Sequence, residues 1–168
     1  AVAAPAAGLH FSRELLKRME TRGINSTHIT LHMGLGHFRT VDVEDLSKHK
    51  MDSEQMIVSE ESSNQINKAK ENGKKVFAVG ITVLRAIETA VTTQSKIKPY
   101  SGWTNKFIFP PHNFSIPDAL ISNFHLPQST MLMTVAAFGG YDNVMRAYNV
   151  AIKEGYKFGT YGDAMLII

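Results

Sequence analysis

Hydrophobic and polar positions follow two different periods along this chain. From residue 27 to residue 33 every second position is apolar, which is typical of a strand with one polar face. Helical spacing of apolar residues predicts helices over 11–22, 62–72, 82–92, 127–138 and 142–154. Most of these segments are followed by a glycine, the residue that most often ends a helix.

Short apolar runs predict further strands at 76–79, 107–109, 120–122 and 165–168. The run at 76–79 is continuous, which is typical of a central strand covered on both faces. Segments 41–56 and 96–103 show no clear period, and we expect an irregular, charged stretch and a loop there. Because strands alternate with helices, we expect a single α/β domain over residues 1–168, with a mixed, mostly parallel sheet and flanking helices.

The composition excludes some classes of protein but does not indicate a function. The 168 residues are 43% hydrophobic and 20% charged, as in an ordinary globular protein. No run approaches the roughly 18 apolar residues of a membrane span, and we see no signal peptide, so we expect no membrane partner. The absence of cysteine excludes disulfides and thiolate chemistry and fits the cytoplasmic location that we expect. A net charge of +3 permits a phosphate-backbone partner without requiring one.

The stretch NFHLPQST at 123–130 packs polar side chains around a proline, directly before a predicted helix. Leu126 precedes the proline and is expected to be extended, whereas Pro127 suits the first turn of a helix. The polar cluster is therefore predicted to lie on a strand-to-helix turn whose backbone N–H groups are free. Such a turn is well placed for a binding or catalytic site.

A second candidate turn lies where the predicted strand ends at Gly80 and a helix begins near Thr82, a plausible N-cap. Ligands of α/β sheets bind at the carboxyl ends of strands. Arg85 occupies the place where a capping box has Glu or Gln, and the helix dipole disfavours a cation there unless an anion lies nearby. That anion could be a ligand carboxylate or phosphate; alternatively, Arg85 pairs with Glu88 or Glu60, or reaches solvent.

Histidines on the polar face of segment 27–33 form a third candidate. His28 and His32 share this face with Thr30, and the face runs into two glycines that would let a ligand approach the backbone. Together with His37 they have a spacing that suggests zinc. Residues 28 and 32 are, however, about 13 Å apart along a strand, so we predict no metal site.

Other residues remain open between structure and function. His10 and His125 could move protons near neutral pH, although a lone histidine beside apolar residues is more often structural. Asp163 is either a helix or loop cap or a ligand for a ribose hydroxyl. Met133 and Trp103 are candidates for stacking on an adenine or another base, although methionines at helical spacing are more typical of a core.

Four motifs occur in order along the chain: APAAGLHF at 4–11, TLHMGLGHF at 30–38, NFHLPQST at 123–130 with AFGG at 137–140, and YGDAM at 161–165. Together they resemble the S-adenosylmethionine:tRNA ribosyltransferase-isomerase family of queuosine biosynthesis, over essentially the whole chain. Members of this family have an α/β fold with a large mixed sheet, and are about twice as long. The resemblance therefore implies the C-terminal part of a larger protein, without the N-terminal part of the catalytic domain and an inserted β-barrel.

The resemblance implies a specific reaction. Family members transfer and isomerise the ribosyl part of S-adenosylmethionine onto a 7-aminomethyl-7-deazaguanine base in the tRNA anticodon. The product is epoxyqueuosine, and adenine and methionine leave. S-adenosylmethionine is then a co-substrate and ribosyl donor, no metal is implied, and tRNA is the partner. The sequence does not indicate an oligomeric state.

This chemistry needs a general base, an acid for the leaving adenine and hydroxyl groups that position the substrate. The resemblance implies two sets of residues, whose individual roles do not follow from the sequence. The candidate catalytic residues are His10, His32, His125, Thr82 and Ser129. The candidates for binding S-adenosylmethionine are Gly80, Thr82, Arg85, Asn123 and Asp163.

The chain also departs from the family pattern, mainly in its polar motifs. Hydroxyl groups, an imidazole, a carboxylate and a glycine of the family are replaced at Ala6, Asp52, Ile81, Val83, Asn105 and Pro111. Polar recognition is sensitive to a single lost partner, so we expect the fold to survive while activity or substrate choice changes. Two alternatives to the family reaction therefore stay open: a diverged paralogue with a different acceptor, and a non-catalytic RNA- or nucleotide-binding module.

Overall fold

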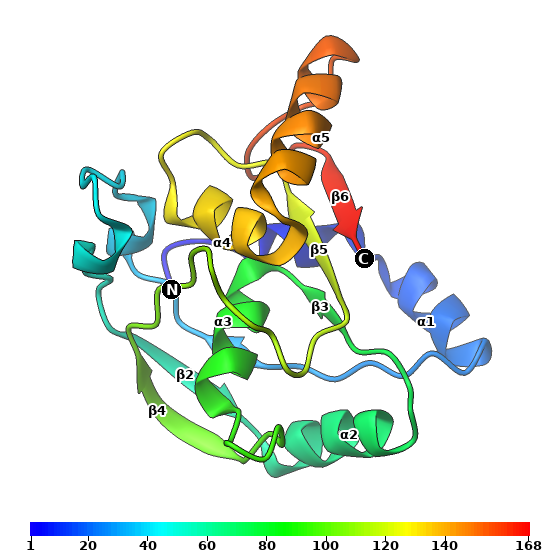
Figure 1. The fold of residues 1–168 in the computed structure, drawn as a ribbon. Coiled ribbons are helices and arrows are strands. Elements are labelled where there is room, and N and C mark those ends of the chain that lie inside the picture. Colours follow the sequence, from blue (N-terminus) through cyan, green and yellow to red (C-terminus); the bar gives the residue numbers. More distant parts are fainter.

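The computed structural model describes the backbone of residues 1–168 and every side chain except that of His37. Helices and two small sheets alternate along the chain (Figure 1), which confirms the predicted α/β class. The helices are α1 (Arg13–Thr21), α2 (Glu60–Glu71), α3 (Ile81–Ala90), α4 (Thr130–Gly139) and α5 (Tyr141–Lys153), with 3-10 turns η1 (Ala6–His10), η2 (Leu35–Phe38) and η3 (Leu46–Lys48). The strands are β1 (Thr30–Leu31), β2 (Glu54–Val58), β3 (Phe77–Val79), β4 (Tyr100–Thr104), β5 (Ala119–Asn123) and β6 (Ala164–Ile167).

The first sheet has the order β1-β2-β4 and is antiparallel throughout. Two of its strands lie in segments that we expected to be irregular, so those two predictions are wrong. In β2 the buried positions alternate with exposed ones, as in other strands. One of the buried positions is, however, the carboxylate of Glu54, which interrupts the apolar pattern in the sequence. The strand predicted at 107–109 does not form either, and that segment is irregular.

The second sheet has the order β3-β5-β6, with β3 and β5 parallel and β5 and β6 antiparallel. One of the four strand pairs is therefore parallel, and the expectation of a mostly parallel sheet is wrong. β2 and β4 pair with each other across the intervening helices, and the order of elements alone did not reveal this pairing. β3 is an edge strand with Phe77 exposed, whereas β5 is the central strand.

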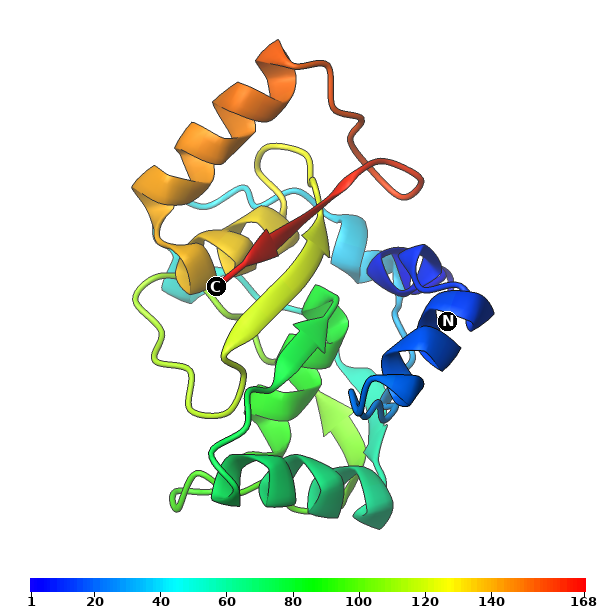
Figure 2. The ribbon, with the colours of Figure 1, turned by 90° about the vertical axis from the view of Figure 1, so that its right-hand side faces the viewer.

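Helix α3 lies between the two sheets (Figures 1 and 2) and supplies core residues to both. Its Leu84 packs with Leu120 of β5 and Val135 of α4. Its Ile87 belongs to a second cluster with Met56 of β2. Because both sheets pack against this one helix, α3 joins the two core clusters.

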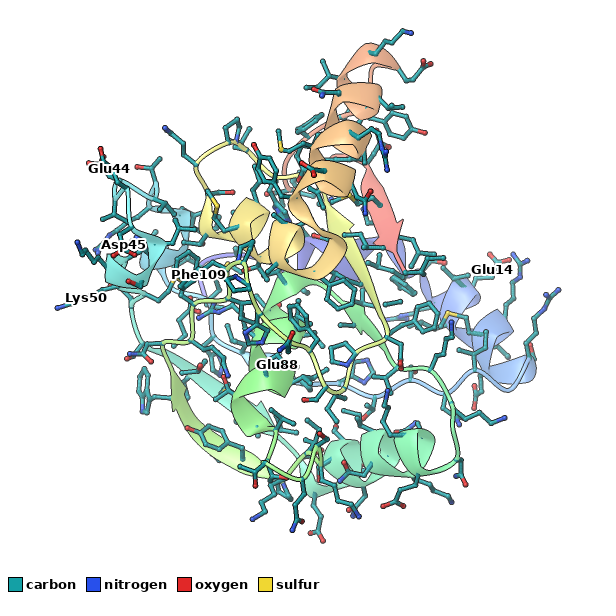
Figure 3. All side chains as sticks on the ribbon, viewed as in Figure 1. Glu14, Glu44, Asp45, Lys50, Glu88 and Phe109 are labelled. Carbon is teal, nitrogen blue, oxygen red and sulfur yellow. The ribbon has the colours of Figure 1, made fainter. Side chains whose placement is uncertain are left out.

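The segment 105–118 crosses α3 and is held there by a buried carboxylate. Figure 3 shows Glu88 of α3 beneath the stretch that carries Phe109. The Glu88 carboxylate lies 3.0 Å from His112 Nε2, and Lys106 Nζ donates to the Glu88 carbonyl at 2.6 Å. These contacts fix an irregular segment without a strand pairing.

Two helices begin at glycines, and α3 does so in place of the predicted cap Thr82. Gly80 and Gly140 precede α3 and α5 with φ of 98° and 78°, a backbone conformation that glycine takes without strain. Neither helix has a side-chain cap, and Thr82 and Asp142 lie within the first turn. The chain therefore reverses sharply at the glycine, and each helix starts before the polar residue.

The remaining α-helices begin with serine caps. Ser12, Ser59 and Ser129 each accept the backbone N–H of the third helical residue of α1, α2 and α4. Because α4 begins only at Thr130, Pro127 lies in the turn before the helix and not in its first turn, contrary to our expectation. None of the described helices is long and apolar enough to cross a bilayer.

Asp118 joins the entry of β5 to α2 and β3. Its carboxylate accepts from Lys70 Nζ at 2.9 Å and from the Val76 N–H at 2.7 Å. Burial by itself would raise the pKa of Asp118, but the Val76 N–H and the Lys70 ammonium outweigh it and hold the pKa below its usual value. The native state therefore gains stability above the unfolded pKa of about 3.9, and this gain is lost as the pH falls through the native pKa.

We expect Asp118→Asn to lower the free energy of unfolding at pH 7 by about 1 kcal/mol, because the amide keeps the Val76 contact but loses the charge. At pH 2.5 the difference between the variant and the parent should be much smaller. Urea unfolding at the two pH values measures both. Asp42→Asn, at an exposed aspartate, is the control and should be neutral; an equal loss at both pH values would contradict the linkage.

Candidate active site

The carboxyl ends of β3 and β5 lie side by side and are crossed by η1. The Gly80 N–H donates to the carbonyl of Ile121 at 2.8 Å, which keeps the two strand ends in register. A Cβ on Gly80 would lie 3.8 Å from the Cβ of Ala7, and His10 Nε2 lies 3.4 Å from Asn123 Nδ2. Three predicted site residues (Gly80, His10 and Asn123) are thus brought to one edge of the sheet, where ligands of α/β proteins bind.

A cavity of about 320 Å³ adjoins this edge. Its walls are the N-terminal segment, the extended chain around β1 and the start of α3: Ala1, Ala3, Ala4, Pro5, Ile29, Thr30, Leu31, His32, Met33, Thr82 and Val83. The Val2 N–H donates to the carbonyl of Met33 at 2.9 Å and holds the first wall against the second. His32 and Thr82 are both among the residues that line the cavity.

Thr82 connects the cavity with the sheet edge. A Cβ built on Gly80 would lie 3.7 Å from Thr82 Oγ1, so the glycine turn and the first residues of α3 form one continuous surface. A ligand in the cavity could therefore extend past the Thr82 hydroxyl toward the carboxyl ends of β3 and β5.

Arg85 is buried and faces an anion from the chain itself. Arg85 NH1 donates to Glu54 Oε2 at 2.6 Å, and both side chains are 2% exposed. Arg85 Nε donates to the carbonyl of Lys106 at 3.0 Å, and Glu54 Oε1 accepts the Gly34 N–H at 2.8 Å. The anion that the sequence led us to expect is thus Glu54, and not Glu88 or Glu60, and the pair holds the turn that follows His32.

Asn123 is buried, and only the nitrogen of its side-chain amide has hydrogen-bond partners among the described residues. Its Nδ2 donates to the carbonyls of Gly159 and Gly162 at 3.3 and 3.2 Å. Its Oδ1 is buried and has no hydrogen-bond partner among the described residues. A buried acceptor without a partner calls for an explanation, and a donor from a ligand at this edge would satisfy it.

Asp163 closes the loop that Asn123 contacts. Its Oδ2 accepts the Lys157 N–H at 2.8 Å, and its carbonyl accepts the Phe124 N–H at 3.3 Å. This is the loop-cap role among the two alternatives left open. The Asp163 side chain is nevertheless in an exposed residue at the same edge as Asn123, so a contact with a hydroxyl group of a ligand is sterically open to it.

His125 and Ser129 lie on the turn between β5 and α4, outside the cavity walls. His125 Nε2 lies 2.8 Å from Ser122 Oγ, and its backbone N–H donates to the hydroxyl of Tyr148 at 2.9 Å. Burial raises the pKa of the Tyr148 phenol, with a smaller opposite effect from that N–H. Ser129 Oγ donates to the carbonyl of Leu126 at 2.7 Å and also caps α4. Both residues therefore build the turn.

Among the described side chains, no group of three histidines, cysteines, aspartates or glutamates is placed to hold a metal ion. His28 and His32 lie on the same extended segment, and the side chain of His37 is outside the described part of the structure. The residue that sequence reasoning missed is Glu54. Its signal was the alternation of β2, in which the buried partners Met56 and Val58 are apolar.

Some of the departures from the family pattern can be located. Ile81 is buried in the core cluster around α3, where an apolar side chain suits its surroundings. Asp52 is exposed and lies 3.4 Å from Arg39 NH1. Val83 lines the cavity, so it is the departure that most directly alters the surface a ligand would meet.

Comparison with known proteins identifies the family to which this chain is similar. The family model described as Queuosine biosynthesis protein matches residues 1–167. The S-adenosylmethionine:tRNA ribosyltransferase-isomerase of Bacteroides fragilis is 66% identical over all 168 residues, which cover 48% of that protein. The protein of the same name from Clostridioides difficile is 53% identical over 165 residues, covering 98% of this chain and 48% of the relative.

A solved structure agrees with these relatives. The crystal structure of S-adenosylmethionine tRNA ribosyltransferase from Thermotoga maritima matches with a TM-score of 0.80 and 39% identity, over 96% of this chain and 51% of that chain. The chain spans about half the length of the curated relatives it matches, 48% in each case. The family match runs through both the cavity and the edge formed by η1, β3 and β5. The chain therefore belongs to the queuosine biosynthesis protein family.

Proposed function

We propose that this chain is the C-terminal part of an S-adenosylmethionine:tRNA ribosyltransferase-isomerase. The reaction would transfer and isomerise the ribosyl part of S-adenosylmethionine onto a 7-aminomethyl-7-deazaguanine base in the tRNA anticodon, giving epoxyqueuosine. The observation that carries the proposal is the 66% identity, along the whole chain, to a relative with that name. A tRNA substrate also supports a cytoplasmic location.

The sheet edge has groups that fit S-adenosylmethionine. The uncommitted Oδ1 of Asn123 could accept a hydrogen bond from the adenine amine or a ribose hydroxyl. The exposed carboxylate of Asp163 suits a ribose hydroxyl, and Gly80 lies at the same edge, close to Ala7 of η1. The Arg85 guanidinium is already paired with Glu54, so we assign it a positioning role.

The chemistry requires a base beside the sulfonium, and His32 is the candidate that the cavity supports best. His32 is exposed and is one of the residues that line the cavity, as is Thr82. The base would take a proton from the carbon next to sulfur, and adenine would then leave with the electrons of its glycosidic bond. The aminomethyl nitrogen of the RNA would attack, and methionine would leave in the later steps.

Other histidines and hydroxyls take supporting roles in this proposal. His10 lies 3.4 Å from the amide of Asn123, where it could protonate the departing adenine. The Thr82 hydroxyl would orient the substrate between the cavity and the edge. His125 and Ser129 would act by holding the turn after β5, because neither lines the cavity.

The test follows adenine release by the full-length gene product, with S-adenosylmethionine and an anticodon stem-loop that carries the aminomethyl-deazaguanine. We expect adenine only when the modified RNA is present. An active family member serves as the control for the RNA and the assay. If that control releases adenine and this protein does not, the proposed reaction is wrong for this protein.

A diverged paralogue with a different acceptor is the second candidate, and Val83 favours it. An apolar side chain lines the cavity where the family has a hydroxyl. Adenine release with an RNA that lacks the aminomethyl-deazaguanine would identify such an acceptor. RNA binding without any binding of S-adenosylmethionine would instead indicate a non-catalytic module.

A further inference from the structure

One face of the first sheet is covered by α3, and the other, which we call the open face, is exposed among the described residues of this chain. Buried and exposed residues alternate along β2 and β4, and the buried side contacts α3 through Met56 and Val58. Figure 1 shows β2 and β4 at the margin of the molecule, with α3 on one side of them. The residues on the open side are exposed: Thr30, His32, Gln55, Ile57, Ser101 and Trp103.

Strand pairing arranges these six residues in two rows across the sheet. Gln55 pairs with Trp103, and the His32 N–H donates to the carbonyl of Gln55 at 2.8 Å. The second row is Thr30, Ile57 and Ser101. Because neighbouring strands are about 4.8 Å apart, each row spans about 10 Å, the width of one or two nucleobases.

The chemistry of the open face differs from that of an ordinary solvated face. Trp103 is 64% exposed and is the single tryptophan of the chain. Beside it lie an amide, an imidazole, two hydroxyls and one aliphatic side chain, and no carboxylate. Unpaired nucleobases stack on such exposed aromatic rings, while neighbouring polar groups bond to their edges. The lack of negative charge suits a phosphate-bearing partner.

The open face also continues the cavity. Thr30 and His32 belong to both the rows and the cavity walls. A nucleotide chain with one base in the cavity would therefore meet Gln55 and then Trp103 on leaving it. This continuity is the reason to assign RNA, and not a second protein, to the open face.

We propose that the open face of the β1-β2-β4 sheet is a stacking platform for an unpaired nucleobase of the RNA substrate, adjacent to the nucleotide that reacts. The base stacks on Trp103, and Gln55 bonds to its edge. This inference rests on the proposed function, since it assumes that the cavity receives the reacting base.

The experiment measures the affinity of the full-length protein for the anticodon stem-loop by fluorescence anisotropy. Trp103→Ala should weaken binding about tenfold, whereas Trp103→Phe should retain most of the affinity. The dependence of the dissociation constant on salt should be unchanged, because no phosphate contact is lost. Tyr141→Ala removes another exposed aromatic ring (64% exposed), at the start of α5, and should bind like the parent.

Spectroscopy and adenine release separate the possible failures. The change in tryptophan fluorescence on adding RNA should be largely absent in Trp103→Phe. This result would show that the change arises from a base that stacks on Trp103. If Trp103→Ala binds RNA like the parent while the parent releases adenine, the platform is wrong and the proposed function stands. If the parent neither binds the RNA nor releases adenine, both are wrong.

Discussion

Replacing Arg85 by leucine should lower the free energy of unfolding by about 3–5 kcal/mol, which is the usual cost of removing one partner of a buried ion pair. Arg85 and Glu54 are each 2% exposed and lie 2.6 Å apart. Without the guanidinium, the Glu54 carboxylate would remain buried beside the Gly34 N–H. Thermal unfolding should show a fall of the melting temperature on the order of 10 °C.

Two further variants decide whether the buried charge is the cause. Lys96→Leu breaks a surface pair with Glu71, in which both side chains are 57% exposed, and should cost at most about 1 kcal/mol. Glu54→Gln combined with Arg85→Leu should cost less than Arg85→Leu alone, because no charge is then left unpaired. If Arg85→Leu costs no more than Lys96→Leu, the pair does not stabilise the fold in the way we describe.

The sequence predicted elements whose signals are local. The helix expected at 11–22 forms as α1, because its serine cap and apolar spacing lie within the segment and Gly23 directly follows it. β2 and β4 could not be recognised in the same way, since each is defined by pairing with the other across 42 or more residues of chain. The buried Glu54 also interrupted the apolar pattern of β2, and only the tertiary partner Arg85 explains it.

The candidate site was likewise predictable from the sequence only in part. The rule that ligands meet the carboxyl ends of strands drew attention to the turn at Gly80, and the parallel pairing of β3 with β5 brings Gly80 and Asn123 to one edge. The cavity itself could not be predicted, since it depends on the N-terminal segment packing against β1 and α3. For Arg85, the partners considered from the sequence were Glu88, which is one helical turn away, and Glu60. The actual partner is Glu54, which lies 31 residues away along the chain.

Replacing His32 by glutamine should lower kcat for adenine release by about 100-fold or more, the usual range for loss of a general acid or base. Glutamine keeps a polar side chain of similar reach on the open face, so the affinity for the RNA stem-loop should change little. The pH profile gives a second readout, since the limb that reports the base in the parent should disappear from the variant. Rapid-quench or steady-state adenine measurements on the full-length protein supply both.

His28→Gln is the matched control for this variant. His28 lies on the same exposed face of the same extended segment, but it is not part of the cavity wall. Its backbone carbonyl accepts from Ser62 Oγ at 2.8 Å, and the substitution leaves that contact in place. We expect His28→Gln to retain the parent's kcat and pH profile. Equal losses in both variants would point to the segment as a whole, and an active His32→Gln would move the search for the base to His10 at the neighbouring edge.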